Sequence, residues 1–299
     1  MSRSRWLADH LMRRGFALRA VRKFMPGEES ADALAAAADL SRFRLGALLT
    51  RLGENLAAES EAAEVRDHYL GVLDRIVDRK LDAHVSVKPT QLGLDFSESQ
   101  CAGHLEELAR KARDTGTCLW IDMEDSSYVD RTLALYRELK SRYSGVGLAM
   151  QAYLRRTPAD LAALLPLRPV IRLVKGAYAE PPRLAFPEKR EVDRAYFNLS
   201  VTLLEAARKG EATPIFGTHD LKLIREIVAR AESLGVGNGR YEIHMLYGIR
   251  MGEQKALAAE GRTVKTLISY GREWFPWYMR RLAERPANVW FVVRSLFTR

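Results

Sequence analysis

The sequence contains only two cysteines, Cys101 and Cys118, among its 299 residues. Their spacing matches neither a zinc-ligand motif nor the multiple-cysteine pattern of a disulfide-stabilised domain. No run of apolar residues approaches the roughly 20 that a membrane-spanning helix needs. These absences exclude a cysteine-based metal domain, and they make a reducing compartment, the cytoplasm, the simplest expectation.

A usable dinucleotide-binding fingerprint is also missing. The only glycine cluster of that kind runs from Gly235 to Gly239, after a predicted helix and before a predicted strand. Pyrophosphate binding needs the opposite order, with the glycines between a strand and the N-terminus of the following helix. We therefore expect this cluster to form a loop, and any nucleotide cofactor to be held in another way.

Acidic residues are too few to balance the basic ones. The chain has 38 Asp and Glu against 47 Lys and Arg, which gives a formal net charge of +9. Such an excess suits nucleic acid, an acidic membrane surface or a phosphate-bearing cofactor. The basic residues are spread along the chain without a long basic block, so we expect no nucleic-acid partner.

The segment from Met1 to Met25 alternates basic and apolar residues, without an uninterrupted apolar core or a small-residue cleavage site. We therefore predict no signal peptide. An ordinary amphipathic helix is the expectation, and peripheral contact with the inner face of a membrane is the alternative.

The order of the predicted elements indicates an α/β fold. Residues 1–80 favour helix throughout, and we predict that they pack as a helical segment on a catalytic domain of residues 81–299. Beyond Lys80, short apolar runs alternate with amphipathic helical patterns, which is typical of parallel βα units. The predicted strands are His84–Val87, Thr117–Met123, Val146–Gln151, Val170–Val174, Pro214–Thr218, Tyr241–Leu246 and Val264–Ser269. Seven strands favour a (βα)8 barrel over a doubly wound sheet, with Ala287–Val293 as the candidate eighth strand.

Polar and ionisable residues recur where the predicted strands end, and in a parallel barrel those ends share one rim, where active sites are built. They are Lys88, Asp122, Gln151, Arg172, Lys175, Thr218 and His219. We expect Lys88 to form an ion pair with Asp122 on the next strand, in preference to a Schiff-base role. For Thr218-His219-Asp220, a phosphate site and a plain helix N-cap both remain open.

A short aromatic-rich helix is predicted near the C-terminus, and its polar side carries Arg280, Arg281 and Glu284, with Tyr278 at the edge. Each guanidinium can donate two parallel hydrogen bonds to a carboxylate or phosphate. Glu284 lies one turn after both arginines and can hold them in position. A carboxylate-binding helix and a solvated helix face fit this spacing equally well.

Asp122, Glu124 and Asp125, together with His219 and His244, raise the alternative of a metal-dependent barrel hydrolase. Strand alternation puts Asp122 and Glu124 on one face, whereas Asp125 belongs to the following turn. Capping of the next helix is therefore the favoured interpretation of this acidic cluster, and we predict no metal site.

Taken in order, these elements resemble the proline dehydrogenase family over roughly Asp82 to Phe297. The matching motifs are Val85–Leu94, Ile121–Asp125, Gln151–Leu154, Arg172–Tyr178, Gly217–Asp220, Met245–Gly248, Tyr278–Glu284 and Pro286–Asn288. The resemblance implies a distorted (βα)8 barrel with the C-terminal arginine helix over its mouth. It also implies noncovalent FAD, oxidation of L-proline to Δ1-pyrroline-5-carboxylate, and transfer of the electrons to a membrane quinone.

The resemblance further implies roles for individual residues. Lys88, Arg280 and Arg281 would hold the substrate carboxylate, and Tyr278 would form a wall of the substrate pocket. Asp122, which would pair with the cations of the pocket, and Arg172, near the flavin N5, would be the catalytic positions. The residues implied to contact FAD are Met123, Gln151, Arg172, Lys175, Gly176, Ala177, Thr218 and His219.

Two positions depart from the family pattern. Leu267 occupies a position at which the family often has a substrate-facing tyrosine, and His244 one at which glutamine is common. A roomier pocket beside Leu267 leaves 4-hydroxyproline or another cyclic amino acid open as the substrate. A nonenzymatic anion-binding protein is a further alternative, and it would show steeply salt-dependent nucleic-acid binding.

Overall fold

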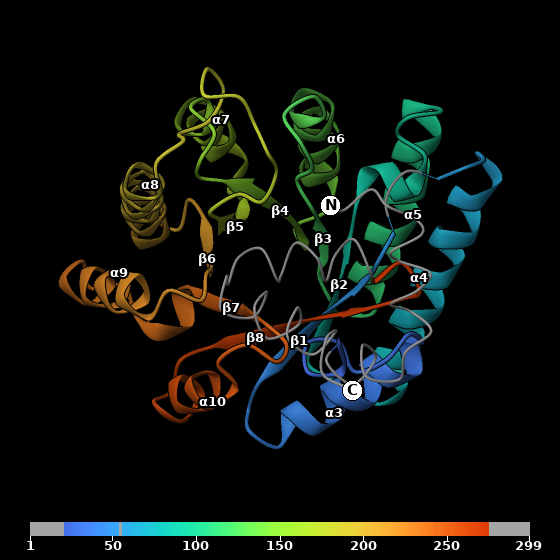
Figure 1. Ribbon diagram of the computed structural model, residues 1–299, viewed down its shortest axis with the longest axis horizontal. Coiled ribbons are helices and arrows are strands. Elements are labelled where there is room, and N and C mark those ends of the chain that lie inside the picture. Colours follow the sequence, from blue (N-terminus) through green and yellow to red (C-terminus); the bar gives the residue numbers. More distant parts are fainter. Residues whose placement is uncertain (1–20, 54–55, 275–299) are drawn as a thin grey trace, which may run out of the picture.

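The chain folds into a closed barrel of eight parallel strands, in a computed structural model that describes residues 21–53 and 56–274. Each strand pairs with its neighbours in chain order, and β8 pairs with β1 to close the barrel. Seen along the barrel, the helices form a ring around the strands (Figure 1). The strands are β1 (Gly46–Arg51), β2 (Ala83–Val87), β3 (Leu119–Ile121), β4 (Val146–Gln151), β5 (Val170–Val174), β6 (Thr213–Gly217), β7 (Glu242–Leu246) and β8 (Val264–Tyr270).

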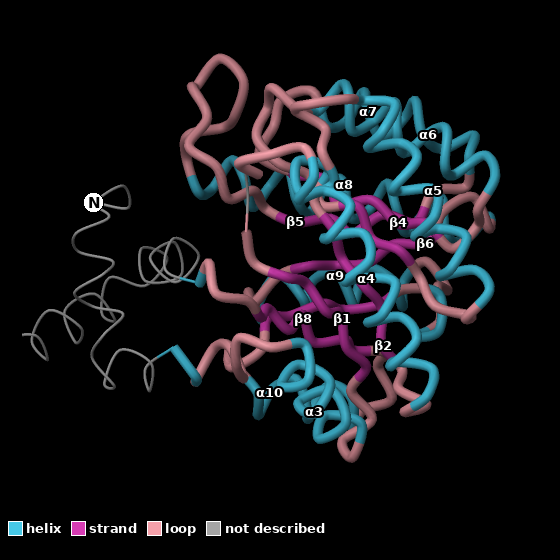
Figure 2. The backbone as a smooth tube through the Cα atoms, turned by 90° about the vertical axis from the view of Figure 1, so that its right-hand side faces the viewer, coloured by secondary structure: helices cyan, strands magenta, loops and turns pink. Residues whose placement is uncertain are grey.

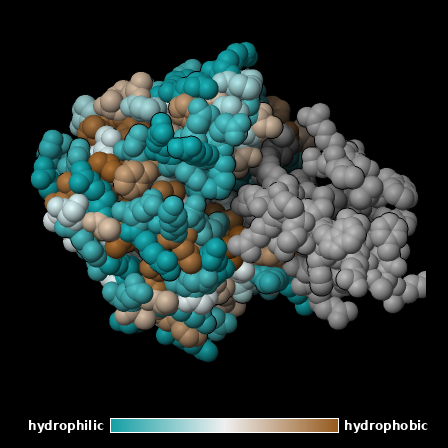
Figure 3. Space-filling model, turned by 60° about the vertical axis from the view of Figure 1, so that its left-hand side comes forward, coloured by the Kyte–Doolittle hydropathy of each residue, from teal (hydrophilic) through white to brown (hydrophobic). Residues whose placement is uncertain are grey.

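Helices connect successive strands and cover the outer face of the barrel, with the strands in the middle of the molecule (Figure 2). The first, α3 (Ser30–Ser41), precedes β1, and the others follow β1–β7 in turn: α4 (Ser60–Asp78), α5 (Glu98–Asp114), α6 (Val129–Arg142), α7 (Thr157–Leu164), α8 (Lys189–Lys209), α9 (Leu221–Ser233) and α10 (Met251–Ala259). Three short 3₁₀ turns complete the connections: Pro89–Leu92, Leu165–Leu167 and Asn238–Arg240. The face drawn in Figure 3 is mostly hydrophilic, with apolar side chains scattered over it, as expected for the solvent side of such helices.

The barrel confirms the predicted fold class, and each of the seven predicted strands corresponds to one of β2–β8. The β4 and β5 boundaries agree with the prediction, whereas β3 is shorter, because pairing is regular only over Leu119–Ile121. The glycine cluster Gly235–Gly239 lies in the connection between α9 and β7, so the predicted loop is confirmed.

The prediction that residues 1–80 are helical throughout was wrong at Gly46–Arg51, which form β1 and close the barrel. Five of the six residues are buried, so this strand has no alternation of apolar and polar side chains. A strand buried on both faces reads as a continuous apolar run, and its alanine and leucines favour helix by propensity. The barrel therefore begins at Gly46 and not at residue 81.

The predicted arginine helix, with Tyr278, Arg280 and Arg281, lies outside the described residues, as does the candidate strand Ala287–Val293. The eighth place in the barrel is taken by β1. Within residues 21–53 and 56–274, no helix is both long and apolar enough to span a membrane.

The barrel interior has its own small apolar cluster, separate from the larger one between strands and helices. Leu48, Trp120 and Ile215 form its buried part, and Leu267 packs against them. The indole of Trp120 fills the space that a side chain at position 147 would need, since a Cβ on Gly147 would lie 2.6 Å from two of its ring carbons. The Trp120 side chain on β3 can therefore take this position only because residue 147 on β4 is glycine.

We expect Gly147→Ala to lower the free energy of unfolding by about 1–3 kcal/mol, because the added methyl group overlaps a buried ring that has little room to move. Gly103→Ala is the matched control. Gly103 lies on α5 with no atom within 4 Å of an added Cβ, and alanine there should be neutral or stabilising by up to about 1 kcal/mol. Urea unfolding of both variants measures the difference, and equal stabilities would contradict the close packing of Trp120.

Candidate active site

A cluster of charges lies at the carboxyl ends of β2, β3 and β5. The carboxylate of Asp122 lies 3.7 Å from the Lys88 ammonium, measured from Oδ2 to Nζ, and also forms an ion pair with Arg172. Ser86 Oγ donates to Asp122 Oδ1 at 2.8 Å and accepts from Arg172 Nη2 at 3.0 Å. The predicted ion pair between Lys88 and Asp122 is confirmed, and Asp122 joins two cations from different strands.

This cluster is largely removed from water. Arg172 is buried, and only 14% of the Lys88 side chain and 17% of the Asp122 side chain are exposed. Removing one partner of such a group would leave a buried charge uncompensated, at a cost of several kcal/mol. The Asp122 carboxylate therefore compensates the charges of two cations, Lys88 and Arg172, at the mouth of the barrel.

Arg172 keeps one nitrogen available. Its Nη2 bonds to Asp122 and Ser86, whereas Nη1 is buried with no hydrogen-bond partner in the described part of the chain. The guanidinium lies over the Trp120 ring, with its carbon 5.0 Å from the ring centroid. A buried guanidinium donor without a partner is unusual and could be satisfied by a ligand that accepts a hydrogen bond there.

Gln151, at the end of β4, presents the complementary group. Its Nε2 donates to the backbone carbonyls of Met123 at 3.4 Å and Glu124 at 3.2 Å, which fixes the side chain. Its Oε1 is buried, and no residue of the described ranges bonds to it. Met123 itself is buried beside it. Gln151 Oε1 and Arg172 Nη1 are thus an acceptor and a donor without partners in the described residues, on the adjacent strands β4 and β5.

The Glu124 carboxylate is engaged by protein hydrogen bonds. Its carboxylate accepts from the Thr90 amide at 3.0 Å and from the Thr90 hydroxyl at 2.6 Å, and both residues are buried. This contact ties the end of β3 to the turn that follows Lys88. Asp125 accepts hydrogen bonds from Ser127, so it stabilises the turn before α6, although no side chain caps that helix.

The loop after β5 brings Lys175, Gly176 and Ala177 to the same rim. Lys175 Nζ lies 2.5 Å from Asp193 Oδ1 on α8 and 3.1 Å from Asp220 Oδ2. Burial raises the pKa of both carboxyls, but their contacts with Lys175 and Lys189, and for Asp220 also the Leu223 amide, outweigh burial, and both pKa values lie below the usual range. Gly176 has a φ of +122°, and a Cβ there would come 2.3 Å from the Tyr153 ring, so only glycine fits.

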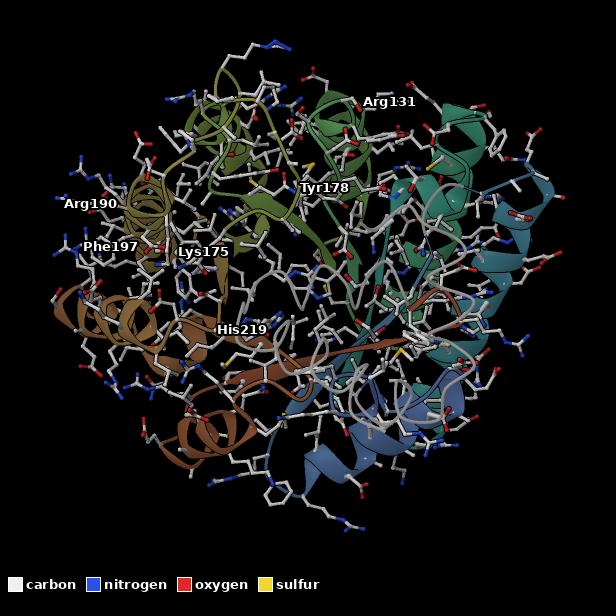
Figure 4. All side chains as sticks on the ribbon, viewed as in Figure 1. Arg131, Lys175, Tyr178, Arg190, Phe197 and His219 are labelled. Atoms are coloured by element: carbon white, nitrogen blue, oxygen red, sulfur yellow. The ribbon has the colours of Figure 1, made fainter. Side chains whose placement is uncertain are left out.

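Thr218 and His219 follow β6. Asp220, the residue after them, is the N-cap of α9, and its side chain accepts from the Leu223 amide at 3.3 Å. His219 Nε2 accepts from the Leu246 amide of β7 at 2.9 Å, so its proton is on Nδ1 when the ring is neutral. Figure 4 shows Lys175 and His219 on the inner side of the helix ring, with Arg190 farther out on α8. Helix capping is thus seen at Asp220, and a phosphate site at Thr218 and His219 stays a prediction.

The residues of the metal-hydrolase alternative have separate partners. Glu124 bonds to Thr90, His219 to Leu246, and His244 to Glu242 at 2.8 Å. In residues 21–53 and 56–274, no group of three or more His, Cys, Asp and Glu side chains is arranged to hold a metal ion. The observed partners therefore give no support to this alternative.

Several residues of the site were missed in the sequence. Ser86 could have been predicted from strand alternation, because it points to the same face of β2 as Lys88, which lies two positions later. Asp193 lies four residues after Lys189 on α8, a spacing that signals an ion pair but does not reveal Lys175 as its second partner. Trp120 is an apolar residue within a strand, so the sequence gives no reason to assign it to the site. Its contact with the Arg172 guanidinium follows only from the register of the strands in the barrel.

Three histidines remain neutral near pH 7, of which His244 is buried and His68 and His84 are half-buried. Burial is the largest cause in each case, and it lowers the pKa of His68, His84 and His244 to about 4. Burial also raises the pKa of Glu242, but the hydrogen bond from His244 and nearby cations outweigh it, and the pKa falls to about 2. The His244–Glu242 pair is therefore a neutral imidazole that donates its Nε2–H to a carboxylate.

Comparison with known proteins gives a consistent family match. The family model described as "Proline dehydrogenase" matches residues 33–294. Proline dehydrogenase 1 of Bacillus subtilis subsp. natto is 37% identical over 278 residues, which cover 92% of this chain and 90% of that protein. Proline dehydrogenase of Deinococcus radiodurans is 35% identical over 279 residues, covering 92% and 89%.

Similar folds occur among solved structures. Proline utilization A (PutA) from Bdellovibrio bacteriovorus, inactivated by N-propargylglycine, matches with a TM-score of 0.83 at 23% identity. A mutant PutA from Bradyrhizobium japonicum matches with a TM-score of 0.77 at 21% identity. Each match covers 90% of this chain but only about a third of the longer one, 33% and 31% respectively. At this level of identity the match establishes the shared barrel fold.

These three histidines predict acid sensitivity. Each has a folded-state pKa of about 4, against an ordinary value of 6.5, so the unfolded chain binds more protons in between. Stability is then complete above pH 6.5 and is lost as the pH falls toward 4. Urea midpoints measured between pH 7.5 and pH 4.5 should decrease steadily below pH 6.5. A midpoint that stays constant or rises over that interval would contradict the burial of these groups as neutral imidazoles.

Proposed function

The chain belongs to the proline dehydrogenase family, and from that premise we propose that it binds FAD noncovalently and oxidises L-proline to Δ1-pyrroline-5-carboxylate. We propose further that the electrons pass to a membrane quinone. The observation that carries the proposal is the pair of orphan polar atoms at the rim, Arg172 Nη1 and Gln151 Oε1, beside the Lys88–Asp122–Arg172 cluster.

These two orphan atoms fit a flavin ring. The isoalloxazine presents an acceptor at N5 and a donor at N3, which complement the Arg172 donor and the Gln151 acceptor. Met123, which is buried and accepts a hydrogen bond from Gln151 at its backbone carbonyl, offers an apolar side chain for contact with a planar ring. Lys175, Gly176, Ala177, Thr218 and His219 would hold the rest of FAD. Lys175 would stay beside Asp193 and Asp220 and act mainly through backbone and fixed charge.

The substrate carboxylate would bind to the free side of Lys88. Arg280 and Arg281 would complete the clamp and Tyr278 would form a pocket wall; these three residues lie beyond the described ranges. A doubly held carboxylate fixes the ring carbon that loses hydride, and such positioning supplies a large part of the rate. Asp122 would act indirectly, because it compensates the positive charges of Lys88 and Arg172 and keeps both side chains oriented.

FAD, when bound, supplies the hydride acceptor of the reaction. The positive charge of Arg172 would stabilise the negative charge that the reduced ring gains. The substrate nitrogen must be neutral to expel a hydride, and no side chain of the rim is an obvious base, so solvent would take that proton before binding. The polar contacts of Ser86 and Asp122 would prevent Arg172 from turning away.

Leu267 bears on the choice of substrate. It packs against Leu48, Trp120 and Ile215 inside the barrel, so it adds an apolar surface without a polar group below the rim. A hydroxyl at C4 of the substrate ring would gain no hydrogen bond from this leucine. L-Proline is therefore the first candidate, with 4-hydroxyproline as the alternative that a less filled pocket would accept.

We expect the purified protein to be yellow, or to become so on reconstitution with FAD, and the flavin absorbance to bleach anaerobically when L-proline is added. The same assay with 4-hydroxyproline, pipecolate and sarcosine ranks the alternative substrates. A quinone analogue should restore the colour. A colourless protein that cannot be loaded with FAD would sink the proposal. If 4-hydroxyproline bleaches the flavin and L-proline does not, the enzyme would be a dehydrogenase of 4-hydroxyproline.

We expect Lys88→Met to raise KM for L-proline roughly 10- to 100-fold, because one charge-assisted hydrogen bond of about 1.5–3 kcal/mol is lost. Arg281→Met should have a similar effect, and FAD should remain bound in both variants. Lys140→Met is the control, since Lys140 is half-buried on the outer helix α6 and donates only to the Ser144 carbonyl. Loss of flavin with unchanged substrate affinity would show that these residues are assigned to the wrong ligand.

A further inference from the structure

One layer of the barrel interior is unusually polar. Side chains from alternate strands fill such a layer, and branched aliphatic residues normally dominate it. Here β1, β3, β5 and β7 contribute Leu48, Trp120, Arg172 and His244, all at most 5% exposed. Trp120 contacts both polar neighbours, with the Arg172 guanidinium 5.0 Å from its ring and the His244 ring centroid at 5.6 Å. The tryptophan thus contacts both the arginine and the histidine.

This layer is costly to the fold. Arg172 Nη1, Trp120 Nε1 and His244 Nδ1 are all buried, and none has a hydrogen-bond partner among the residues that the structure describes. A buried polar atom left unsatisfied costs about 1–3 kcal/mol. Three such atoms in one layer favour a role beyond packing, because aliphatic side chains would fill the same volume without this cost.

The layer is fixed from several sides. Glu242, near the floor of the barrel, accepts from His244 Nε2 at 2.8 Å. The His244 ring meets the Trp120 ring edge-on, at an interplanar angle of 73°. Gly147 leaves the space that the indole occupies, since a Cβ at position 147 would collide with it. A chain of defined contacts therefore runs from the floor of the barrel to the guanidinium at its mouth.

Charge in the layer is restricted to Arg172. His244 is held neutral by burial, and its unprotonated Nδ1 is an acceptor. The charged groups that act on its pKa are Glu242 on its own strand, Arg172 on β5 and Lys265 on β8. A second cation here would repel Arg172 toward solvent, whereas a neutral ring and an indole face attract it or leave it in place.

We propose that Trp120 and His244 are positioning residues for Arg172. Together they hold the guanidinium in the orientation in which Nη2 bonds to Asp122 and Ser86 and Nη1 remains directed to a ligand. The inference rests on the proposed function in one respect, that this ligand is the flavin. In this proposal, the effect of both residues reaches the reaction only through Arg172.

The test compares a removed ring with a retained one. Trp120→Leu removes the π-face under Arg172, and Trp120→Phe keeps it. His244→Leu removes the polar support of the indole, and His244→Gln restores an acceptor. His104→Leu is the matched control, because His104 is also a buried histidine, but it lies on α5 and bonds to the Leu92 carbonyl, outside this layer. Each variant is loaded with FAD and checked for folding by circular dichroism.

In Trp120→Leu and His244→Leu we expect kcat for L-proline to fall about tenfold or more, with KM nearly unchanged. We also expect the reduction equilibrium of the bound flavin to shift about tenfold against the reduced form, which is about 30 mV for a two-electron couple. Trp120→Phe and His244→Gln should recover most of both losses. His104→Leu should lower stability without moving the potential.

The proposal is overturned if the folded leucine variants retain the wild-type flavin potential and kcat, or if His104→Leu moves the potential as much as His244→Leu does. If Trp120→Leu does not fold, the His244→Leu and His244→Gln pair decides alone. Failure of the proposed function looks different, because the wild-type protein would then bind no FAD or would not be bleached by L-proline.

Discussion

The carboxylate of Asp122 is the group on which the rest of the site depends. It is the only negative charge between Lys88 and Arg172 in the contacts described, and all three side chains are largely buried. Without it, two cations would lie close together in a medium of low dielectric, at a cost of several kcal/mol. Asp122 therefore holds two cations together that would otherwise repel each other, while Arg172 Nη1 is left without a hydrogen-bond partner among the described residues.

Much of this arrangement is predictable from the sequence. Short strands and amphipathic helices alternate from His84 onward, so the barrel follows from periodicity. The contact between Lys88 and Asp122 follows from their places at the ends of adjacent strands. The strand Gly46–Arg51 is not predictable in the same way, because burial on both faces erases alternation and leucine and alanine suit a helix equally. The Gln151 and Arg172 positions are predicted, but not that each retains a buried polar atom without a partner.

The interior layers are the least predictable part. Strand alternation tells that Trp120 and Asp122 share a face, but the stagger of the barrel decides which residues of other strands they meet. The contacts from Trp120 to Arg172 and to His244 join residues that are 52 and 124 positions apart, as the numbering shows. Gly147 illustrates the same limit, since a lone glycine in a strand signals a close approach without naming the side chain that makes it.

The pairing of β1 with β8 has a consequence for how the chain folds. Gly46 lies opposite Lys265, so the barrel closes only when segments more than two hundred positions apart meet. Pairings of such long range carry a large loop-closure entropy and slow folding. During synthesis β1 can pair with β2 early, while its other edge stays open until β8 leaves the ribosome. That edge, rich in leucine, is where a growing chain would be most exposed to association with another copy or to capture by a chaperone.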